Sequence, residues 1–206
     1  MAINYPIPIP TAIGISQVTF SMVNTKTLSQ SPFTGAQQQY VWPRQQWEVD
    51  VVIPPIQRQD GAEEWITFLA KLQAGTSTSF PSFHMSDPNG YPIGSQGTNF
   101  TVQSSGPNLI DLSGLQGGTN NVLAQGDYIR IGTGEAARYH KVLDQVDSDS
   151  SGNAQASIWP SNKQAGPVEG SLQDAYGTFM MDNNSPSFTI NDISSYGISF
   201  KARSLI

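Results

Sequence analysis

Cysteine is absent from the 206-residue chain, which excludes disulfide bonds, thiolate metal sites, iron–sulfur clusters and cysteine nucleophiles. Charged residues are also scarce: they make up 13% of the chain, about half of the ~25% that is usual for soluble domains. No run of 18 apolar residues occurs, so we expect no membrane partner. The first basic residue is Lys26, and the missing basic region of a signal peptide predicts synthesis in the cytoplasm.

Acidic residues outnumber basic ones by 16 to 10, which gives a formal net charge of -6. A dedicated nucleic-acid binder would carry a basic stripe, so we expect no specific nucleic-acid binding. The chain instead contains 19 Gly, 14 Pro and many neutral polar residues. This composition is typical of an all-β protein, and also of a surface that neighbouring subunits cover. The length allows one large domain or two small ones, with enough core to fold without a metal.

Residues that could carry catalysis are few. His84 and His140 are the only histidines, and they form neither an HExxH motif nor another ligand spacing. The sequence also contains no GxSxG elbow, no phosphate-binding Walker loop and no dinucleotide fingerprint. We therefore predict structural roles for both histidines, no catalytic residues, no cofactor, no metal and no enzyme activity.

The pair Asp147-x-Asp149 imitates the start of a calcium-binding loop. The twelfth position of such a loop would be Ile158, where a bidentate glutamate is required. A hairpin tip explains the same residues, because Asp, Ser, Gly and Asn are turn formers. We favour the turn.

Prolines alternate with isoleucines in the first fourteen residues. Because proline fixes φ and removes a hydrogen-bond donor, residues 1–14 are expected to form an extended arm. The arm is either a frayed terminus or a segment that lies on another subunit. Tyr5, Ile7 and Ile9 make the second alternative attractive, because together they are a large apolar surface to leave in water.

Three strand patterns and one helix pattern follow. Alternation predicts strands over 17–22 and 37–42, the second of which we expect to end at Pro43. In 47–53 the odd-numbered residues are apolar and share one face, and the prolines at 54–55 are expected to end that strand.

The segment 60–73 predicts an amphipathic helix. Asp60 is the expected N-cap, Glu63 completes a capping box, and Gly75 is the expected stop. Four apolar residues follow the helical spacing and make one stripe: Trp65, Phe68, Leu69 and Leu72. The stripe contains no polar residue, so we assign it to packing against the sheet.

The later part of the chain predicts a second β module. Residues 86–121 are rich in turn formers and are expected to be a linker or the start of that module. From residue 122 to 160, strand patterns separated by turns predict an antiparallel meander of roughly forty residues. Short β candidates follow at 177–181 and 187–190, and a C-terminal strand at 196–202 is expected to pair back onto the first sheet.

The predicted fold class is therefore mainly β. It consists of a β-barrel or sandwich with one packed α-helix, plus a second small β module inserted before a C-terminal closing strand. We expect the first module to comprise residues 15–85 and 170–206 and the inserted module to comprise residues 86–169.

Two segments of the sequence resemble the tail proteins of tailed phages. The run SPFTGAQQQYVWPRQQWEVDVVIPPI, followed by DGAEEWITFLAKLQ, resembles the N-terminal half of these proteins. The later run LAQGDYIRIGTGEAARYHKVLDQVDSDSSGNAQASIWP resembles their second module. Both matches occur in order, so the similarity to distal tail or tail-hub proteins covers most of residues 15–206.

The resemblance implies a structural virion protein of the tail tip. Such proteins form rings, typically hexameric, that join the tail tube protein to baseplate or tail-tip proteins. It also implies a β-barrel or sandwich with one helix, and it brings no catalytic residues. At the interfaces of such an assembly we expect five residues: Tyr5, Ile7, Ile9, Tyr128 and Trp159.

Two alternatives remain open. A carbohydrate-binding β module at the tail tip would contact the host surface through exposed aromatic residues around Tyr91, Tyr128 and Trp159. An enzyme such as a cell-wall hydrolase is the third possibility, and nothing in the sequence favours it.

Overall fold

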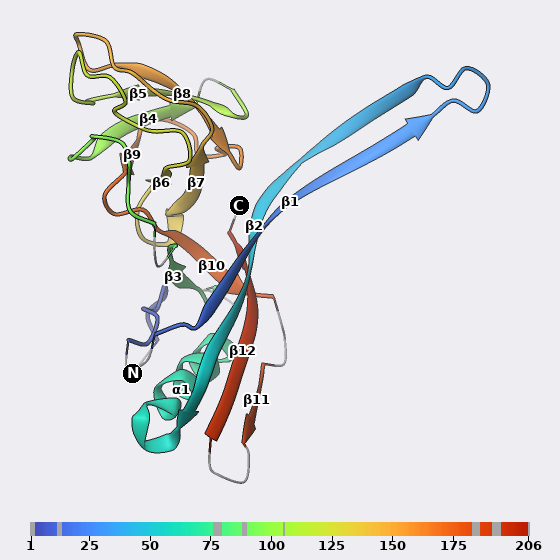
Figure 1. Ribbon diagram of the computed structural model, residues 1–206, viewed down its shortest axis with the longest axis vertical. Coiled ribbons are helices and arrows are strands. Elements are labelled where there is room, and N and C mark those ends of the chain that lie inside the picture. The colour runs from blue at the N-terminus through green and yellow to red at the C-terminus, as the bar shows by residue number, and fades with distance from the viewer. Residues whose placement is uncertain are drawn as a thin grey trace.

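The computed structural model describes residues 3–11, 14–75, 80–87, 90–104, 106–182, 186–190 and 195–205. A six-stranded sheet and a closed six-stranded barrel make up most of this part of the chain (Figure 1). The described residues form one α-helix, which packs on the sheet. The fold class predicted from the sequence is confirmed, and the closed barrel is the inserted module.

The sheet is antiparallel, and its order is β1-β2-β12-β10-β3, with β11 paired to β12. Its strands are β1 (Gln17–Gln30), β2 (Gln37–Gln57), β3 (Phe83–Met85), β10 (Gly177–Met181), β11 (Ser187–Ile190) and β12 (Ser195–Ser204). The C-terminal strand β12 pairs with β2 from Glu48 to Gln57, so the predicted closing strand is confirmed.

Strand β2 continues through all the prolines that we expected to break it. Pro43 lies opposite a register shift of the β1–β2 pair, between Asn24 and Lys26. The prolines at 54–55 lie opposite a second shift, between Tyr196 and Ile198 of β12. A bulge leaves residues outside the regular ladder, so the missing N–H of proline costs little there. The strand ends predicted at these prolines are therefore wrong.

Helix α1 (Ala62–Gln73) follows a 3₁₀ turn, η1 (Arg58–Asp60). The expected capping box is not formed: the N-cap is Gly61 at φ 110°, and no side chain caps the helix. Glu63 instead forms an ion pair with Arg58 at 2.8 Å. At the other end the C-cap is Ala74, which places Gly75 at the C′ position where the stop was expected.

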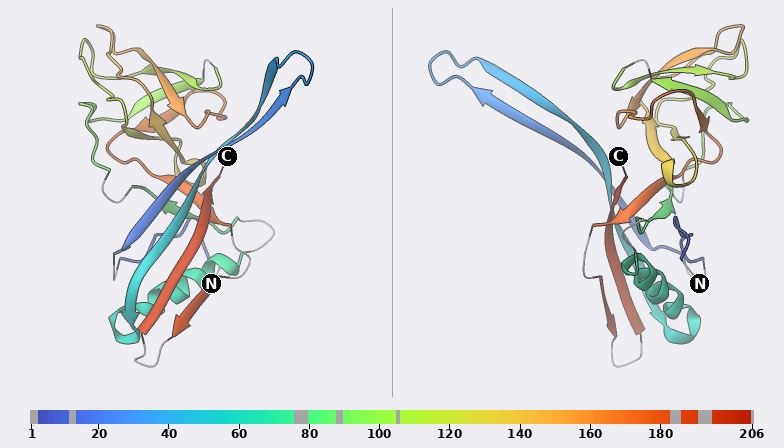
Figure 2. Two further views of the ribbon diagram at one scale, coloured as in Figure 1. Left: turned by 45° about the vertical axis from the view of Figure 1, so that its right-hand side comes forward. Right: turned by 180° about the vertical axis from the view of Figure 1, so that it is seen from behind.

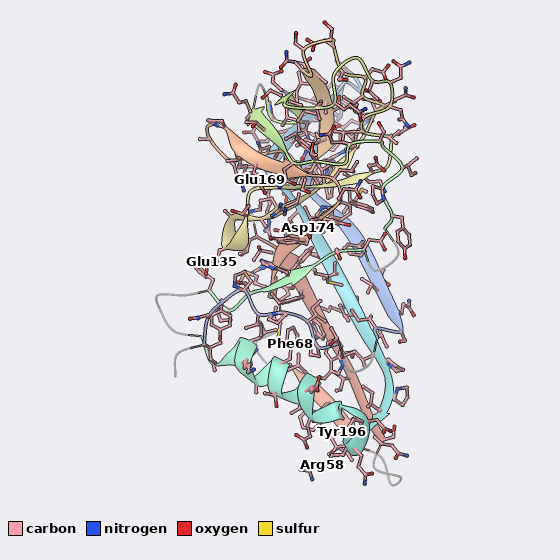
Figure 3. The ribbon with its side chains drawn as sticks, turned by 90° about the vertical axis from the view of Figure 1, so that its left-hand side faces the viewer. Arg58, Phe68, Glu135, Glu169, Asp174 and Tyr196 are labelled. Atoms are coloured by element: carbon pink, nitrogen blue, oxygen red, sulfur yellow. The ribbon has the colours of Figure 1, made fainter. Side chains whose placement is uncertain are left out.

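The apolar stripe of α1 is confirmed, because all four of its residues are buried. Trp65 meets Phe68 edge to face at 5.8 Å, and Phe68 lies 6.1 Å from the ring of Phe200 on β12. These rings join the helix to one face of the sheet (Figure 3). Burial of each such side chain contributes about 1.5–3 kcal/mol.

The barrel has the order β4-β5-β8-β7-β6-β9 and is closed. Its strands are β4 (Phe100–Ser104), β5 (Leu109–Ser113), β6 (Tyr128–Ile131), β7 (Arg138–Val142), β8 (Ala154–Trp159) and β9 (Val168–Ser171). The segment that we expected to be linker or module start thus supplies two full strands. The module is larger than the predicted forty-residue meander, and β9 runs slightly past the expected boundary at residue 169.

Aromatic contacts join the barrel to the sheet. Trp47 of β2 donates through Nε1 to the carbonyl of Tyr139 at 2.9 Å and meets Trp159 edge to face at 4.6 Å. Tyr139 stacks on Tyr128 at 4.7 Å. We refer to Trp47, Tyr128, Tyr139 and Trp159 as the aromatic joint. It fixes the barrel against the sheet.

The N-terminal residues lie on their own chain. Ile7 forms a parallel bridge with Phe83 of β3 and is only 7% exposed. The hydroxyl of Tyr5 donates to the carbonyl of Lys71 at 2.5 Å, at the end of α1. Residues 3–11 are therefore not frayed. The core of its own chain covers Ile7, and Tyr5 and Ile9 are partly buried against that core. An intersubunit role for these three residues stays a prediction.

Candidate interaction surface on a projecting hairpin

The outer halves of β1 and β2 project away from the body of the protein. Strand β12 covers the edge of β2 only from Glu48 onward, so residues 24–44 pair with each other alone. Figures 1 and 2 show this hairpin running away from both the barrel and α1. We call residues 24–44 the projecting hairpin.

The tip of the projecting hairpin, at residues 31–36, is a hydrogen-bonded turn. The backbone N–H of Ser31 donates to Ala36 O at 2.9 Å, and that of Gly35 donates to Ser31 O at 3.0 Å. Gly35 has φ 69°, a value that favours glycine. The Ser31 hydroxyl accepts weak bonds from the N–H groups of Phe33 and Thr34, at 3.4 and 3.3 Å. Phe33 itself points into solvent.

Large apolar side chains on this hairpin are exposed on both faces. The pair Thr27–Tyr40 places Tyr40 and Trp42 on one face, where their rings meet edge to face at 4.8 Å. The other face carries Leu28 and Val41. The exposed fractions are Leu28 63%, Phe33 95%, Tyr40 58%, Val41 46% and Trp42 49%. Large apolar side chains exposed together on one element make this hairpin a candidate interaction surface.

The strand edges of the hairpin are open as well. An isolated two-stranded ribbon is marginally stable in water, and its unpaired N–H and C=O groups can pair with another chain. Lys26 and the bulge opposite Pro43 are features that limit uncontrolled edge pairing. The hairpin therefore combines open strand edges with features that restrain uncontrolled pairing.

Charge separates the hairpin from the rest of the molecule. Its only charged residues are Lys26 and Arg44, which give +2. Since the whole chain carries -6, the remaining residues carry -8. The hairpin and the rest of the molecule therefore carry net charges of opposite sign.

The other expected interface residues occupy the aromatic joint. Tyr128 and Trp159 are half-buried and contact Trp47, while Lys141 Nζ lies 4.5 Å from the ring centroid of Tyr128. Most of both rings is covered within one copy. Tyr91, at 87% exposure, projects into solvent. An intersubunit role for Tyr128 and Trp159 stays a prediction.

Both histidines have structural partners. His84 Nε2 lies 3.2 Å from Gly134 O, and its ring centroid lies 4.3 Å from that of Tyr176, with the two planes tilted by 36°. His140 is buried in the barrel wall, with Nδ1 2.8 Å from Pro160 O. Burial lowers the pKa of His140 to about 4, so this imidazole is neutral at pH 7.

The two aspartates of the calcium-like motif organise a turn. Asp149 accepts hydrogen bonds from the backbone N–H groups of Ser151 and Asn153, both at 2.8 Å. Asp147 accepts one from the N–H of Asn121 at 2.6 Å. These bonds lower the pKa of each carboxyl group. Within the described ranges, no three potential ligand side chains gather closely enough to hold a metal ion.

No protein-family model matches the chain, and no curated protein matches it. In the part of the chain that the structure describes, no helix combines the length and the apolar character needed to cross a membrane.

The sequence analysis missed the residues that make the hairpin an interaction surface. The strands were expected to be much shorter, so no hairpin was expected that would expose Leu28, Phe33, Tyr40 and Trp42. One signal was present: residues 24–44 combine β-forming residues with apolar side chains on both faces and contain no acid. A buried strand would not carry so many glutamines, and a solvated strand would not carry so many large apolar residues.

Proposed function

We propose that this protein is a structural virion subunit that assembles with copies of itself through the projecting hairpin. The assembly is a ring, hexameric by resemblance, in the distal tail or tail hub of a tailed phage. It joins the tail tube protein to baseplate or tail-tip proteins. The single observation that supports this function most is the projecting hairpin, whose large apolar side chains are exposed in a single copy.

A second copy is the partner that the charges favour. The projecting hairpin has a net charge of +2 and the rest of the chain has a net charge of -8, so the two attract each other. Every copy supplies both surfaces. Because the projecting hairpin and the surface that binds it are different parts of the molecule, the contact is heterologous. A heterologous contact repeats around a rotation axis and closes into a ring when the rotation allows it.

The carbohydrate-binding alternative is weaker. A sugar-binding platform needs exposed aromatic faces, but stacking by Tyr139 and the neighbouring ammonium of Lys141 occupies the ring of Tyr128. Trp159 is packed against Trp47. Tyr91 alone would remain as a contact.

Removing the apolar side chains of the hairpin is expected to abolish assembly. In the triple variant Leu28→Ser, Tyr40→Ser, Trp42→Ser, the purified protein should have the mass of a single chain by light scattering, whereas the unchanged protein should form a ring. Burying apolar surface contributes about 25 cal/mol per Å² to binding. Without its apolar side chains, the projecting hairpin would no longer bind the neighbouring copy. Unfolding of the body should be unaffected, because these residues do not contact either core.

Tyr91→Ser is the matched control, since it removes an exposed aromatic residue outside the hairpin. It should assemble like the unchanged protein. An unchanged protein that is monomeric at all concentrations, or a triple variant with the full ring mass, would contradict the proposal.

A further inference from the structure

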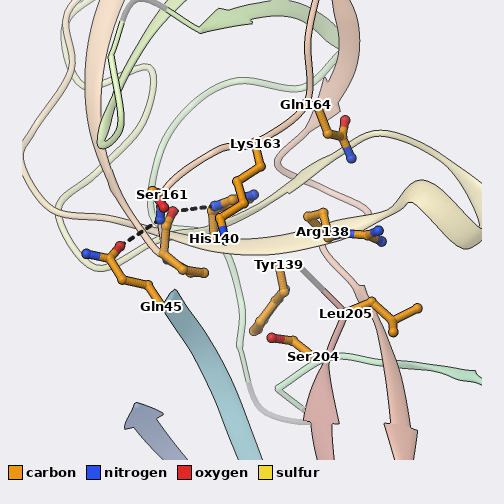
Figure 4. Close-up of a pocket in the computed structure, with 10 residues that line it drawn as sticks. Gln45, Arg138, Tyr139, His140, Ser161, Lys163, Gln164, Ser204 and Leu205 are labelled. Atoms are coloured by element: carbon orange, nitrogen blue, oxygen red, sulfur yellow. Dashed lines mark hydrogen bonds between the residues drawn. The ribbon is translucent and has the colours of Figure 1, made fainter. Parts of the chain in front are cut away.

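A cavity of about 210 Å³ lies where the barrel meets the sheet. Its walls come from β7, from the segment that follows β8, and from the neighbouring parts of β2 and β12. Figure 4 shows Gln45 and Ser161 on one side and Arg138 and Gln164 on the other. The cavity lies within a single copy of the chain and is separate from the projecting hairpin.

Two cations line this cavity without a carboxylate to neutralise them. Arg138 donates through Nη1 only to backbone carbonyls, Glu135 O at 2.7 Å and Ala137 O at 3.1 Å. Neither Arg138 nor Lys163 forms an ion pair among the described residues, and no acid lines the cavity. Burial lowers the pKa of Arg138, as expected for a guanidinium that loses water without gaining a counter-ion.

Two buried acceptors also belong to the cavity wall. A carbonyl oxygen only accepts, so His140 Nδ1 must carry the proton that it donates to Pro160 O, which leaves Nε2 as an acceptor. This Nε2 is buried and has no partner in the described part of the chain, and the same holds for Gln164 Oε1. An unpaired buried acceptor is costly, and a donor that reaches it recovers that free energy.

We propose that this cavity binds a small hydroxylated organic anion, such as a sugar acid or a sugar phosphate. The anionic group pairs with Arg138 and Lys163, and hydroxyl groups donate to His140 Nε2 and Gln164 Oε1. A neutral sugar leaves the cations unpaired, and acetate leaves the acceptors unpaired, so each lacks one half of the recognition. Since drug-sized pockets span about 300–1,000 Å³, this smaller cavity takes a ligand of monosaccharide size.

Calorimetric titration of the full chain with four probes tests this proposal. D-glucuronate and D-glucose 6-phosphate distinguish a carboxylate from a phosphate, D-glucose lacks the charge, and acetate lacks the hydroxyl groups. We expect one of the two hydroxylated anions to bind at least about tenfold more tightly than glucose and acetate. Lys163→Gln should weaken that binding by about tenfold, and Lys163→Arg should retain it.

Lys71→Gln is the matched control, because it removes an exposed lysine that lies on α1, outside the cavity. It should leave the binding unchanged. The proposal is overturned if neither hydroxylated anion binds at about 10 mM, if glucose binds equally well, or if Lys163→Gln has no larger effect than the control. These outcomes concern a single copy and are independent of whether a ring forms.

Discussion

Trp65→Ala is expected to lower the free energy of unfolding by about 3–5 kcal/mol, the range for deleting a large aromatic side chain from a core. Trp65 is fully buried and forms part of the contact between α1 and the sheet. Its ring lies 5.8 Å from Phe68 on the helix and 6.4 Å from Phe200 on β12. Alanine would leave a cavity between these rings, which the rigid sheet cannot close. Urea unfolding followed by far-UV circular dichroism measures the change.

Two further variants sharpen this test. Tyr91→Ala removes an exposed aromatic residue and should change the free energy of unfolding by less than about 0.5 kcal/mol. Trp65→Phe keeps most of the ring and removes a buried indole N–H that has no partner among the described residues, so it should cost less than alanine. A urea midpoint for Trp65→Ala equal to that of Tyr91→Ala would show that α1 is not part of the core.

Acidification from pH 7.5 to 5 is expected to destabilise the protein by about 2 kcal/mol through His140 alone, since burial lowers the pKa of this group from 6.5 to about 4. In the unfolded chain the imidazole takes up a proton below about pH 6.5, whereas in the folded chain it stays neutral until about pH 4. Lowering the pH through this window therefore favours the unfolded state. The contribution is fully present above pH 6.5 and is lost as the pH falls toward 4.

Other groups titrate over the same range, so the test is the difference between two proteins. His140→Asn removes the titration and keeps a side-chain N–H directed at Pro160 O. Its free energy of unfolding should depend on pH less than that of the unchanged protein, by about 2 kcal/mol. His84→Asn, at the less buried histidine, should retain most of the dependence. Equal pH dependence in the His140→Asn variant and the unchanged protein would exclude a buried neutral imidazole.

The spacing of apolar residues along the sequence predicted much of the fold, because it indicates which face of a strand or helix is buried. Period-two alternation in β2 and the helical stripe of α1 each place apolar residues on one face, and the structure buries those faces. The prolines of β2 do not end the strand, although a local pattern would predict that they do. Their effect on a strand depends on whether a neighbour needs their N–H, and the bulges that remove that need involve pairing with β1 and β12, far away in sequence.

The barrel shows a second limit. Strands β4 and β5 were hidden among turn formers, because each is only five residues long and is buried by partners that come much later in the chain. Phe100 and Val102 do alternate with polar residues. An alternation this short is too weak to be distinguished from a loop without knowledge of the closed barrel.

The candidate sites were harder still. The sequence indicated an interaction protein, but it placed the contacts at the N-terminal arm and the aromatic joint. Ile7 is an example: apolar residues between prolines look unpartnered until β3 is known to lie beside them. The cavity at His140 combines residues from four segments that are separated in the sequence, and no residue spacing predicts such a site.

Photo-crosslinking from the tip of the projecting hairpin tests the central claim most directly. The variant Phe33→p-benzoylphenylalanine places a photoreactive group at the most exposed apolar position of the hairpin, and the same analogue at Tyr91 serves as the control. After irradiation of the purified protein, we predict that position 33 links two copies, through a peptide that lies outside residues 24–44 of the second copy. Single chains without cross-links, or equal linkage from positions 33 and 91, would contradict the account.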